Sequence, residues 1–104
     1  MITQEQINTI ISKIAKSYKP EKIILFGSYA KGEEKEDSDL DILVVKNTKE
    51  RFFDRTRAVR KVLQPQIVPM DILVYTPEEF EQKKNELNHI VYIINKEGRV
   101  FYEK

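Results

Sequence analysis

Hydrophobic residues recur along the first part of the chain with a helical period and then stand in an unbroken run. Between residues 7 and 18 they occupy every third or fourth position, which predicts an amphipathic helix. Thr3 and Gln6 fit a capping box at the start of this helix, and Pro20 ends it. The run from Ile23 to Phe26 predicts a strand that is covered on both faces.

The remaining hydrophobic pattern alternates between strand and helix. It predicts a turn and loop at 29–38, a strand at 39–45, a helix around 52–63, a strand at 67–75, a helix from 77, a helical stretch at 87–94 and an edge strand at 99–102. We expect Asn47 or Thr48 to cap the helix around 52–63. We also expect Pro69 to restrict regular pairing of the third strand to residues 70–74, and a break near Asn85 to divide the last helical region.

This order of elements predicts an α/β (α+β) fold in which helices pack on a mixed sheet of about four strands. The first two strands are joined by a loop of only about ten residues, which disfavours a purely parallel, doubly wound sheet. A chain of 104 residues is too short for two domains, so residues 1–104 are expected to form a single domain.

The composition fits a folded domain and excludes several classes of protein. Hydrophobic residues make up 40% of the chain, which is enough for one core. A formal net charge of +1 argues against strong nucleic-acid binding and against attraction to anionic membranes. The absence of cysteine excludes disulfides and thiolate metal sites. The sequence has neither a signal-peptide pattern nor a membrane-spanning run, so we expect a cytoplasmic protein.

Three acids stand in segments that otherwise hold apolar side chains. Asp39 and Asp41 are two residues apart, so in a strand their side chains point to the same side. Asp71 lies between Met70 and Ile72 in another apolar strand. Because a buried carboxylate without a partner is costly, these acids are expected either to be paired with other groups or to bind a cation. Ligands that are all oxygen suit Mg²⁺ or Mn²⁺ better than Zn²⁺.

A candidate phosphate-binding turn follows the first strand directly. Gly27 allows the backbone to approach a ligand closely, and the amides that follow it can form an anion-binding nest. Ser28 adds a hydroxyl group. The phosphate turn and the pair of acids therefore fall on two strands that a single loop joins, an arrangement that fits a nucleoside triphosphate with bound metal.

These residues also carry a family resemblance. The segment Gly27-Ser28-Tyr29-Ala30-Lys31-Gly32, followed after five residues by Ser38-Asp39-Leu40-Asp41-Ile42, resembles the signature of nucleotidyltransferases of the DNA polymerase β superfamily. The chain is most similar to the minimal nucleotidyltransferases, stand-alone catalytic domains paired with HEPN-domain proteins in toxin–antitoxin systems. The resemblance covers nearly the whole chain and implies the polymerase-β type of nucleotidyltransferase fold.

The resemblance implies that Gly27, Ser28 and Lys31 bind the triphosphate of ATP or another nucleoside triphosphate. Family members commonly carry arginine at the position of Lys31. Lysine keeps the positive charge but lacks the planar, bidentate guanidinium, so a planar phosphate clamp is not expected here.

The resemblance also implies that Asp39, Asp41 and Asp71 are the catalytic acids and bind the metal, with two Mg²⁺ ions expected and Mn²⁺ as the alternative. Asp71 would in addition help to deprotonate the acceptor hydroxyl. The implied reaction transfers a nucleoside monophosphate, AMP from ATP, to a hydroxyl of a HEPN toxin. The chain would then act as an antitoxin and form a hetero-oligomer with its partner.

Each of these interpretations has a simpler alternative. Asp39 and Asp41 could close a turn in solvent, and Asp71 could face water at the start of a strand. The basic residues between 51 and 61 are interpreted as a solvated helix face rather than a nucleic-acid patch, and His89 as an ordinary, partly exposed side chain. At the level of function, the alternatives are a non-catalytic antitoxin that neutralises its partner by binding, and a nucleotidyltransferase for small molecules such as antibiotics.

Overall fold

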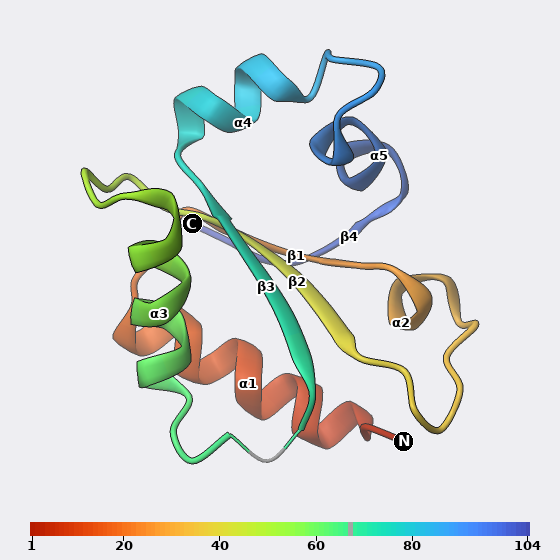
Figure 1. Cartoon of the computed structure of the whole chain (residues 1–104). Coiled ribbons are helices and arrows are strands. Elements are labelled where there is room, and N and C mark those ends of the chain that lie inside the picture. The colour runs from red at the N-terminus through yellow and green to blue at the C-terminus, as the bar shows by residue number, and fades with distance from the viewer. Residues whose placement is uncertain (67) are drawn as a thin grey trace.

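The computed structural model describes residues 1–66 and 68–104, which form an open sheet with helices on both faces (Figure 1). The helices are α1 (Gln4–Ser17), α2 (Ser28–Lys31), α3 (Phe52–Val62), α4 (Pro77–Lys83) and α5 (Ile90–Glu97), and the strands are β1 (Lys22–Phe26), β2 (Leu40–Val45), β3 (Met70–Tyr75) and β4 (Arg99–Glu103).

The sheet has the strand order β3-β2-β1-β4. β1 is antiparallel to both β2 and β4, whereas β2 and β3 run parallel. The α3 helix makes the crossover between the two parallel strands. The predicted mixed, four-stranded sheet is therefore confirmed.

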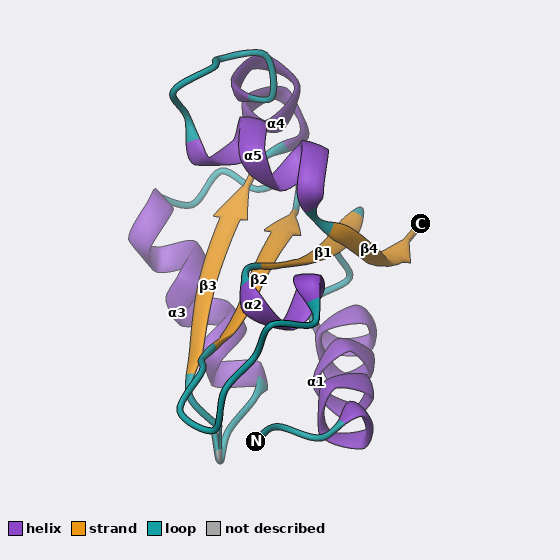
Figure 2. Ribbon diagram, turned by 90° about the vertical axis from the view of Figure 1, so that its right-hand side faces the viewer, coloured by secondary structure: helices purple, strands orange, loops and turns teal. Residues whose placement is uncertain are grey.

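Successive residues of each central strand enter two different cores. On one face, Ile42 and its even-numbered neighbours of β2 pack with α1 and α3. On the other face, Leu43 and Val45 pack with Phe80 of α4 and Ile94 of α5. Figure 1 shows α1 and α3 on one side of the strands and α4 and α5 on the other, and Figure 2 shows that β2 and β3 point towards α4 and α5. Asp41 of β2 and Asp71 of β3 alternate along their strands with the residues that pack with α1 and α3. Their side chains therefore lie on the opposite face of the sheet, which carries α4 and α5.

Two helices begin where the sequence predicted. Thr3 accepts a hydrogen bond from the backbone of Gln6, and the Gln6 side chain returns one to the backbone of Thr3, which is a complete capping box. Thr76 and Glu79 form the same arrangement at the start of α4. The predicted break near Asn85 is confirmed, because α4 ends at Lys83 and α5 begins at Ile90.

The predicted cap of α3 is wrong. This helix begins at Phe52, its N-cap residue is Arg51, and no side chain makes a capping hydrogen bond. The hydroxyl of Thr48 instead accepts from the backbone amide of Glu50 at 3.1 Å. Because the Thr48 hydroxyl is engaged within this local turn, it does not cap α3. For the third strand, regular pairing begins at Met70, and the predicted start at position 67 lies outside the described residues.

The interpretation of residues 51–61 as a solvated face is wrong for Arg55, whose side chain is buried. Its guanidinium donates to the carboxylate of Glu79 at 2.7 and 3.3 Å and to the carbonyl oxygens of Glu50 and Val74. A fixed guanidinium with several acceptors is the usual way in which a buried arginine is stabilised. Arg55 therefore ties α3, β3 and α4 together.

Side chains of α3 also cover the free edge of β3. Arg60 donates to the carbonyl oxygen of Met70 at 3.0 Å, Thr56 to that of Ile72 at 3.5 Å, and Arg55 to that of Val74 at 3.3 Å. Alternate carbonyl groups of an edge strand point away from the sheet and can recruit another chain. In this protein α3 occupies them and holds β3, with Asp71, in register.

Candidate active site

Asp41 and Asp71 lie directly beside each other in the parallel β2–β3 pair. Both side chains project from the face that carries α4 and α5. Asp41 is half-buried and Asp71 is exposed, since the two helices cover the other end of this face. Two predicted site residues that are thirty positions apart in the chain are thus brought together by strand register.

The Asp41 carboxyl group is electrostatically strained. Partial burial is the largest cause that raises the pKa of Asp41, and the neighbouring Asp71 carboxyl adds to it through its charge and a shared hydrogen bond. The charge of Asp39 contributes as well, and together they raise the pKa to about 6. A carboxyl group whose negative charge is disfavoured by burial and by neighbouring acids is a favourable environment for a cation.

Asp39 precedes β2, which begins at Leu40, and its side chain is exposed. Its position in the loop therefore differs from the predicted start of the strand. Across residues 1–66 and 68–104, no three histidine, cysteine, aspartate or glutamate side chains are close enough to form a preassembled metal cluster. The structure thus brings Asp41 and Asp71 together, and leaves Asp39 at the margin of the pair.

Gly27 packs against the Asp41 carboxylate from the neighbouring strand. Phe26 pairs with Asp41 in the β1–β2 register, and Gly27 follows with φ of 73° and ψ of −154°. A Cβ atom at position 27 would collide with Asp41 Oδ2. Both the backbone conformation and the space therefore require glycine.

The α2 helix is a single turn that starts directly at this glycine. The amides of Ala30 and Lys31 donate to the Gly27 carbonyl oxygen at 3.1 and 3.3 Å, and the turn ends at Gly32. The first amides of any helix have no carbonyl partner within that helix. The α2 turn therefore starts at the residue that packs against the Asp41 carboxylate, and Asp41 is the register neighbour of Asp71.

Two contacts anchor the turn, and sequence reasoning missed both. Tyr29 is buried, and its hydroxyl oxygen accepts from the backbone amide of Ile2 at 2.9 Å. Lys31 Nζ forms an ion pair with Glu97 Oε1 of α5 at 3.1 Å. No local signal could have revealed either one, because each contact joins segments that are far apart in the sequence.

His89 has a structural role that its isolated position did not indicate. It is the N-cap residue of α5, and its Nδ1 accepts from the backbone amide of Val91 at 3.1 Å. Its ring also contacts Tyr75 edge-on, with 5.9 Å between ring centroids. The side chain is partly exposed, as expected.

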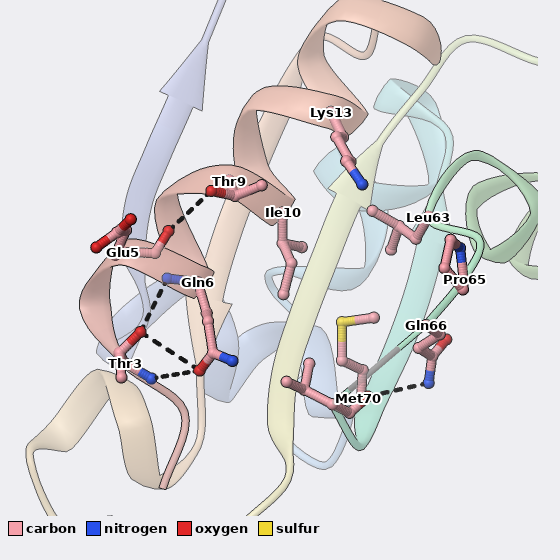
Figure 3. A pocket seen from close by; sticks show the side chains of 11 residues that line it. Thr3, Glu5, Gln6, Thr9, Ile10, Lys13, Leu63, Pro65, Gln66 and Met70 are labelled. Atoms are coloured by element: carbon pink, nitrogen blue, oxygen red, sulfur yellow. Dashed lines mark hydrogen bonds between the residues drawn. The ribbon is translucent and has the colours of Figure 1, made fainter.

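A pocket of about 440 Å³ lies between α1 and the connection from α3 to β3. Figure 3 shows Ile10, Leu63 and Met70 around it, with the capping residues Thr3 and Gln6 at one side. These residues belong to the α1 and α3 face of the sheet, opposite the face with Asp41 and Asp71. The pocket is therefore separate from the candidate active site.

The residues of the site fit a hard divalent cation. The donors are carboxylate oxygens, and burial together with the neighbouring acids Asp71 and Asp39 raises the pKa of Asp41, so a cation would stabilise the ionised form. The adjoining turn offers backbone amides and a hydroxyl, which suit phosphate oxygens.

Among the described residues, no helix is long and apolar enough to cross a membrane.

The chain is similar in sequence and in fold to known proteins. A family model described as a nucleotidyltransferase domain matches residues 5–93. A Methanocaldococcus jannaschii protein named a protein adenylyltransferase is 38% identical over 100 residues, which cover 95% of this chain and 93% of that protein.

Two crystal structures share the fold. One is a Sulfolobus solfataricus protein named a nucleotidyltransferase, with a TM-score of 0.66 and 24% identity over 94% of this chain and 78% of that one. The other is a toxin–antitoxin with AMP-PNP, with a TM-score of 0.64 and 21% identity over 93% of this chain and 73% of that one. The family match and the full-length relative show that the chain belongs to the nucleotidyltransferase domain family.

Proposed function

We propose that this nucleotidyltransferase moves AMP from ATP to a hydroxyl group of a protein partner, and that the partner is a HEPN toxin which the transfer inactivates. The observation that carries the proposal is the contact between the Gly27 turn and Asp41, which is itself the register neighbour of Asp71. A phosphate-binding turn and paired carboxylates at one place are what adenylyl transfer needs.

The α2 turn would bind the triphosphate. Gly27 lets the backbone approach the phosphate oxygens, Ser28 donates a hydroxyl hydrogen bond, and Lys31 contributes positive charge. Binding at several points fixes the α-phosphorus next to the acids, so that the reacting groups meet in a defined orientation.

Asp41 and Asp71 would hold Mg²⁺, with Asp39 completing the ligand set from the adjoining loop; two ions are proposed, and Mn²⁺ would serve as the alternative. When bound, the metal would supply neutralisation of the negative charge on the phosphate groups. Asp71 is the more exposed of the strand acids, so it would be the more accessible to an incoming acceptor.

In the transfer step the acceptor hydroxyl oxygen attacks the α-phosphorus of ATP. A new P–O bond forms, the bond between the α-phosphorus and its bridging oxygen breaks, and pyrophosphate leaves with that electron pair. The hydroxyl proton passes to Asp71 and from there to water. The products are the AMP ester of the acceptor, pyrophosphate and a proton.

Two of the comparisons support a protein acceptor. The full-length relative is named a protein adenylyltransferase, and one of the similar structures is a toxin–antitoxin with AMP-PNP. A small catalytic domain that receives its acceptor from a partner fits residues 1–104 as a single domain. We also propose that the protein is cytoplasmic and forms a hetero-oligomer with its toxin.

The test is intact-mass spectrometry of a co-expressed or purified HEPN partner, with and without this chain and MgATP. Transfer adds the mass of one or more AMP units to the partner. Asp41→Asn and Asp71→Asn should each abolish the gain, while Asp37→Asn, an exposed acid of the same loop region, should leave it intact. An unchanged mass gain in both active-site variants would refute the proposal.

A binding-only antitoxin is the second candidate, favoured by the exposed apolar side chains of Leu87, Ile90 and Ile93 around α5. Cell growth with the toxin separates the two functions. A variant with all three acids changed to asparagine should still bind the toxin but no longer neutralise it if catalysis is required. Full neutralisation by that variant would instead support the binding-only function.

A further inference from the structure

The only positive side chain of the α2 turn is paired with a carboxylate from another part of the chain. Lys31 Nζ lies 3.1 Å from Glu97 Oε1, and the two side chains are 48% and 50% exposed. Glu97 is the last residue of α5, so this ion pair links the C-terminal helix to the candidate phosphate turn. A carboxylate at this position is unexpected for a site that binds a polyanion.

The position of Glu97 is fixed by its surroundings. Val91 and Ile94 bury the inner side of α5 against β1 and β2. Gly98 follows Glu97 in a place where a Cβ atom would lie 2.5 Å from the carbonyl oxygen of Ile94 and 2.6 Å from Cγ2 of Ile24. The end of α5 therefore rests directly on β1, and Glu97 is held next to the segment that leads into Gly27.

From this geometry we infer that Glu97 is a built-in competitor of the nucleotide: it occupies Lys31 in the free protein, and the triphosphate must displace it. This inference rests on the proposed role of the α2 turn in nucleotide binding. Glu97 thereby becomes a residue that sets nucleotide affinity without touching the reacting atoms. Its effect falls on the binding of ATP and not on the transfer step.

Competition for one positive charge explains why Glu97 is expected to weaken nucleotide binding. One ammonium group cannot pair fully with both the Glu97 carboxylate and a phosphate, so binding must overcome an existing ion pair. Both side chains are half-exposed, which makes their interaction weak and sensitive to salt. The triphosphate carries several negative charges and can displace a single carboxylate, at the expense of part of its affinity.

The experiment is a double-mutant cycle on ATP binding, measured by titration calorimetry at low ionic strength with MgATP and, as a probe without a base, with magnesium tripolyphosphate. Glu97→Gln should lower the Kd for MgATP by about 1.5- to fivefold, the range expected for an exposed ion pair. Lys31→Gln should raise the Kd. In the Lys31→Gln background, Glu97→Gln should have no further effect, because the contested ammonium is gone.

The matched control is Glu81→Gln on α4. Glu81 is exposed and pairs with a partly exposed lysine, Lys84, at 2.8 Å, but in a different part of the fold from the α2 turn, so its loss should leave the Kd unchanged. In a transfer assay, Glu97→Gln should lower KM for ATP and leave kcat unchanged. Thermal unfolding of each variant verifies that the fold is intact.

Two results would overturn the inference. In the first, Glu97→Gln leaves the Kd unchanged or raises it, which would mean that Glu97 is neutral or positions Lys31 for the phosphate. In the second, the tighter binding persists in the Lys31→Gln background, which would mean that Glu97 repels the nucleotide directly. If the wild-type protein binds neither ATP nor tripolyphosphate, the proposed function fails together with the inference.

Discussion

The Cα atom of Gly27 faces the carboxylate of Asp41 so closely that a methyl group at position 27 would overlap Asp41 Oδ2. The first residue of the phosphate turn is thus packed against a metal-binding candidate from the next strand. This contact makes the two halves of the site one unit, and a change in either half is expected to disturb the other.

Gly27→Ala should therefore destabilise the protein and abolish ATP binding. We expect a loss of about 2–3 kcal/mol in the free energy of unfolding, from the strained backbone and the collision together. Urea unfolding and calorimetric titration with MgATP measure the two effects. Gly32→Ala is the matched control: its φ is also positive, at 71°, but nothing lies within 4 Å of an added Cβ atom, so only about 1 kcal/mol should be lost. Equal losses at both positions would show that packing against Asp41 is unimportant.

Asp41→Asn should abolish transfer and yet stabilise the metal-free fold at neutral pH. The folded-state pKa of Asp41 is raised from 3.8 to about 6, so the folded protein binds the proton more tightly than the unfolded chain does. Stability therefore falls as the pH rises from about 4 to 6, and above that range the ionised carboxylate is a full penalty. We expect the variant to gain about 1 kcal/mol at pH 7.5, less than the shift alone implies, because the carboxyl group is partly exposed and screened.

The gain from Asp41→Asn should shrink as the pH is lowered through 6 towards 4. Chemical denaturation in EDTA across this range measures it, with Asp37→Asn as the exposed control. If the gain in the free energy of unfolding did not change with pH, this would contradict the raised pKa of Asp41. Addition of Mg²⁺ should stabilise the wild-type protein and leave Asp41→Asn unaffected.

Arg55→Met should cost about 2–4 kcal/mol of stability. The substitution leaves the Glu79 carboxylate and the carbonyl oxygens of Glu50 and Val74 without their buried donor. Arg57→Met is the control, because its ion pair with Asp54 is exposed and should contribute less than about 0.5 kcal/mol. Thermal unfolding compares the two variants. A similar small loss of stability in both would show that the buried contacts of Arg55 contribute little to stability.

The same contact predicts how stability responds to acid. The hydrogen bond from Arg55 is the main cause that lowers the pKa of Glu79 below its ordinary value of 4.5. The ionised Glu79 therefore contributes its full stabilisation at pH values above about 4.5. This stabilisation is lost as the pH falls through the lower pKa that Glu79 has in the folded state. Unfolding measured between pH 5 and 3 should show a steeper loss in the wild type than in Glu79→Gln.

His89→Ala should destabilise α5 by about 0.5–1.5 kcal/mol, through loss of the hydrogen bond from the Val91 amide and of the ring contact with Tyr75. His89→Asn can replace the cap but not the ring, so it should recover part of that loss. Hydrogen exchange of the α5 amides localises the effect. Identical behaviour of the two variants would assign the whole contribution to the ring.

Local features of the sequence accounted for most of the elements. The capping pairs Thr3–Gln6 and Thr76–Glu79 act within four residues, so the residues themselves specify where α1 and α4 begin. The cap of α3 was mispredicted because the Thr48 hydroxyl could serve either the helix or a local turn, and it accepts from the amide of Glu50 in the turn.

By itself, the sequence determined the strand periods, the Gly27-Ser28 turn and the spacing of Asp39 and Asp41, because these depend on neighbouring residues and on a motif of fixed spacing. Only the tertiary structure decided that Asp41 stands beside Asp71, that Arg55 is buried and that Glu97 reaches Lys31. Each of these contacts joins residues that lie far apart in the chain, and strand register and helix packing alone bring them together. Residue type and local period carry no information on such distances.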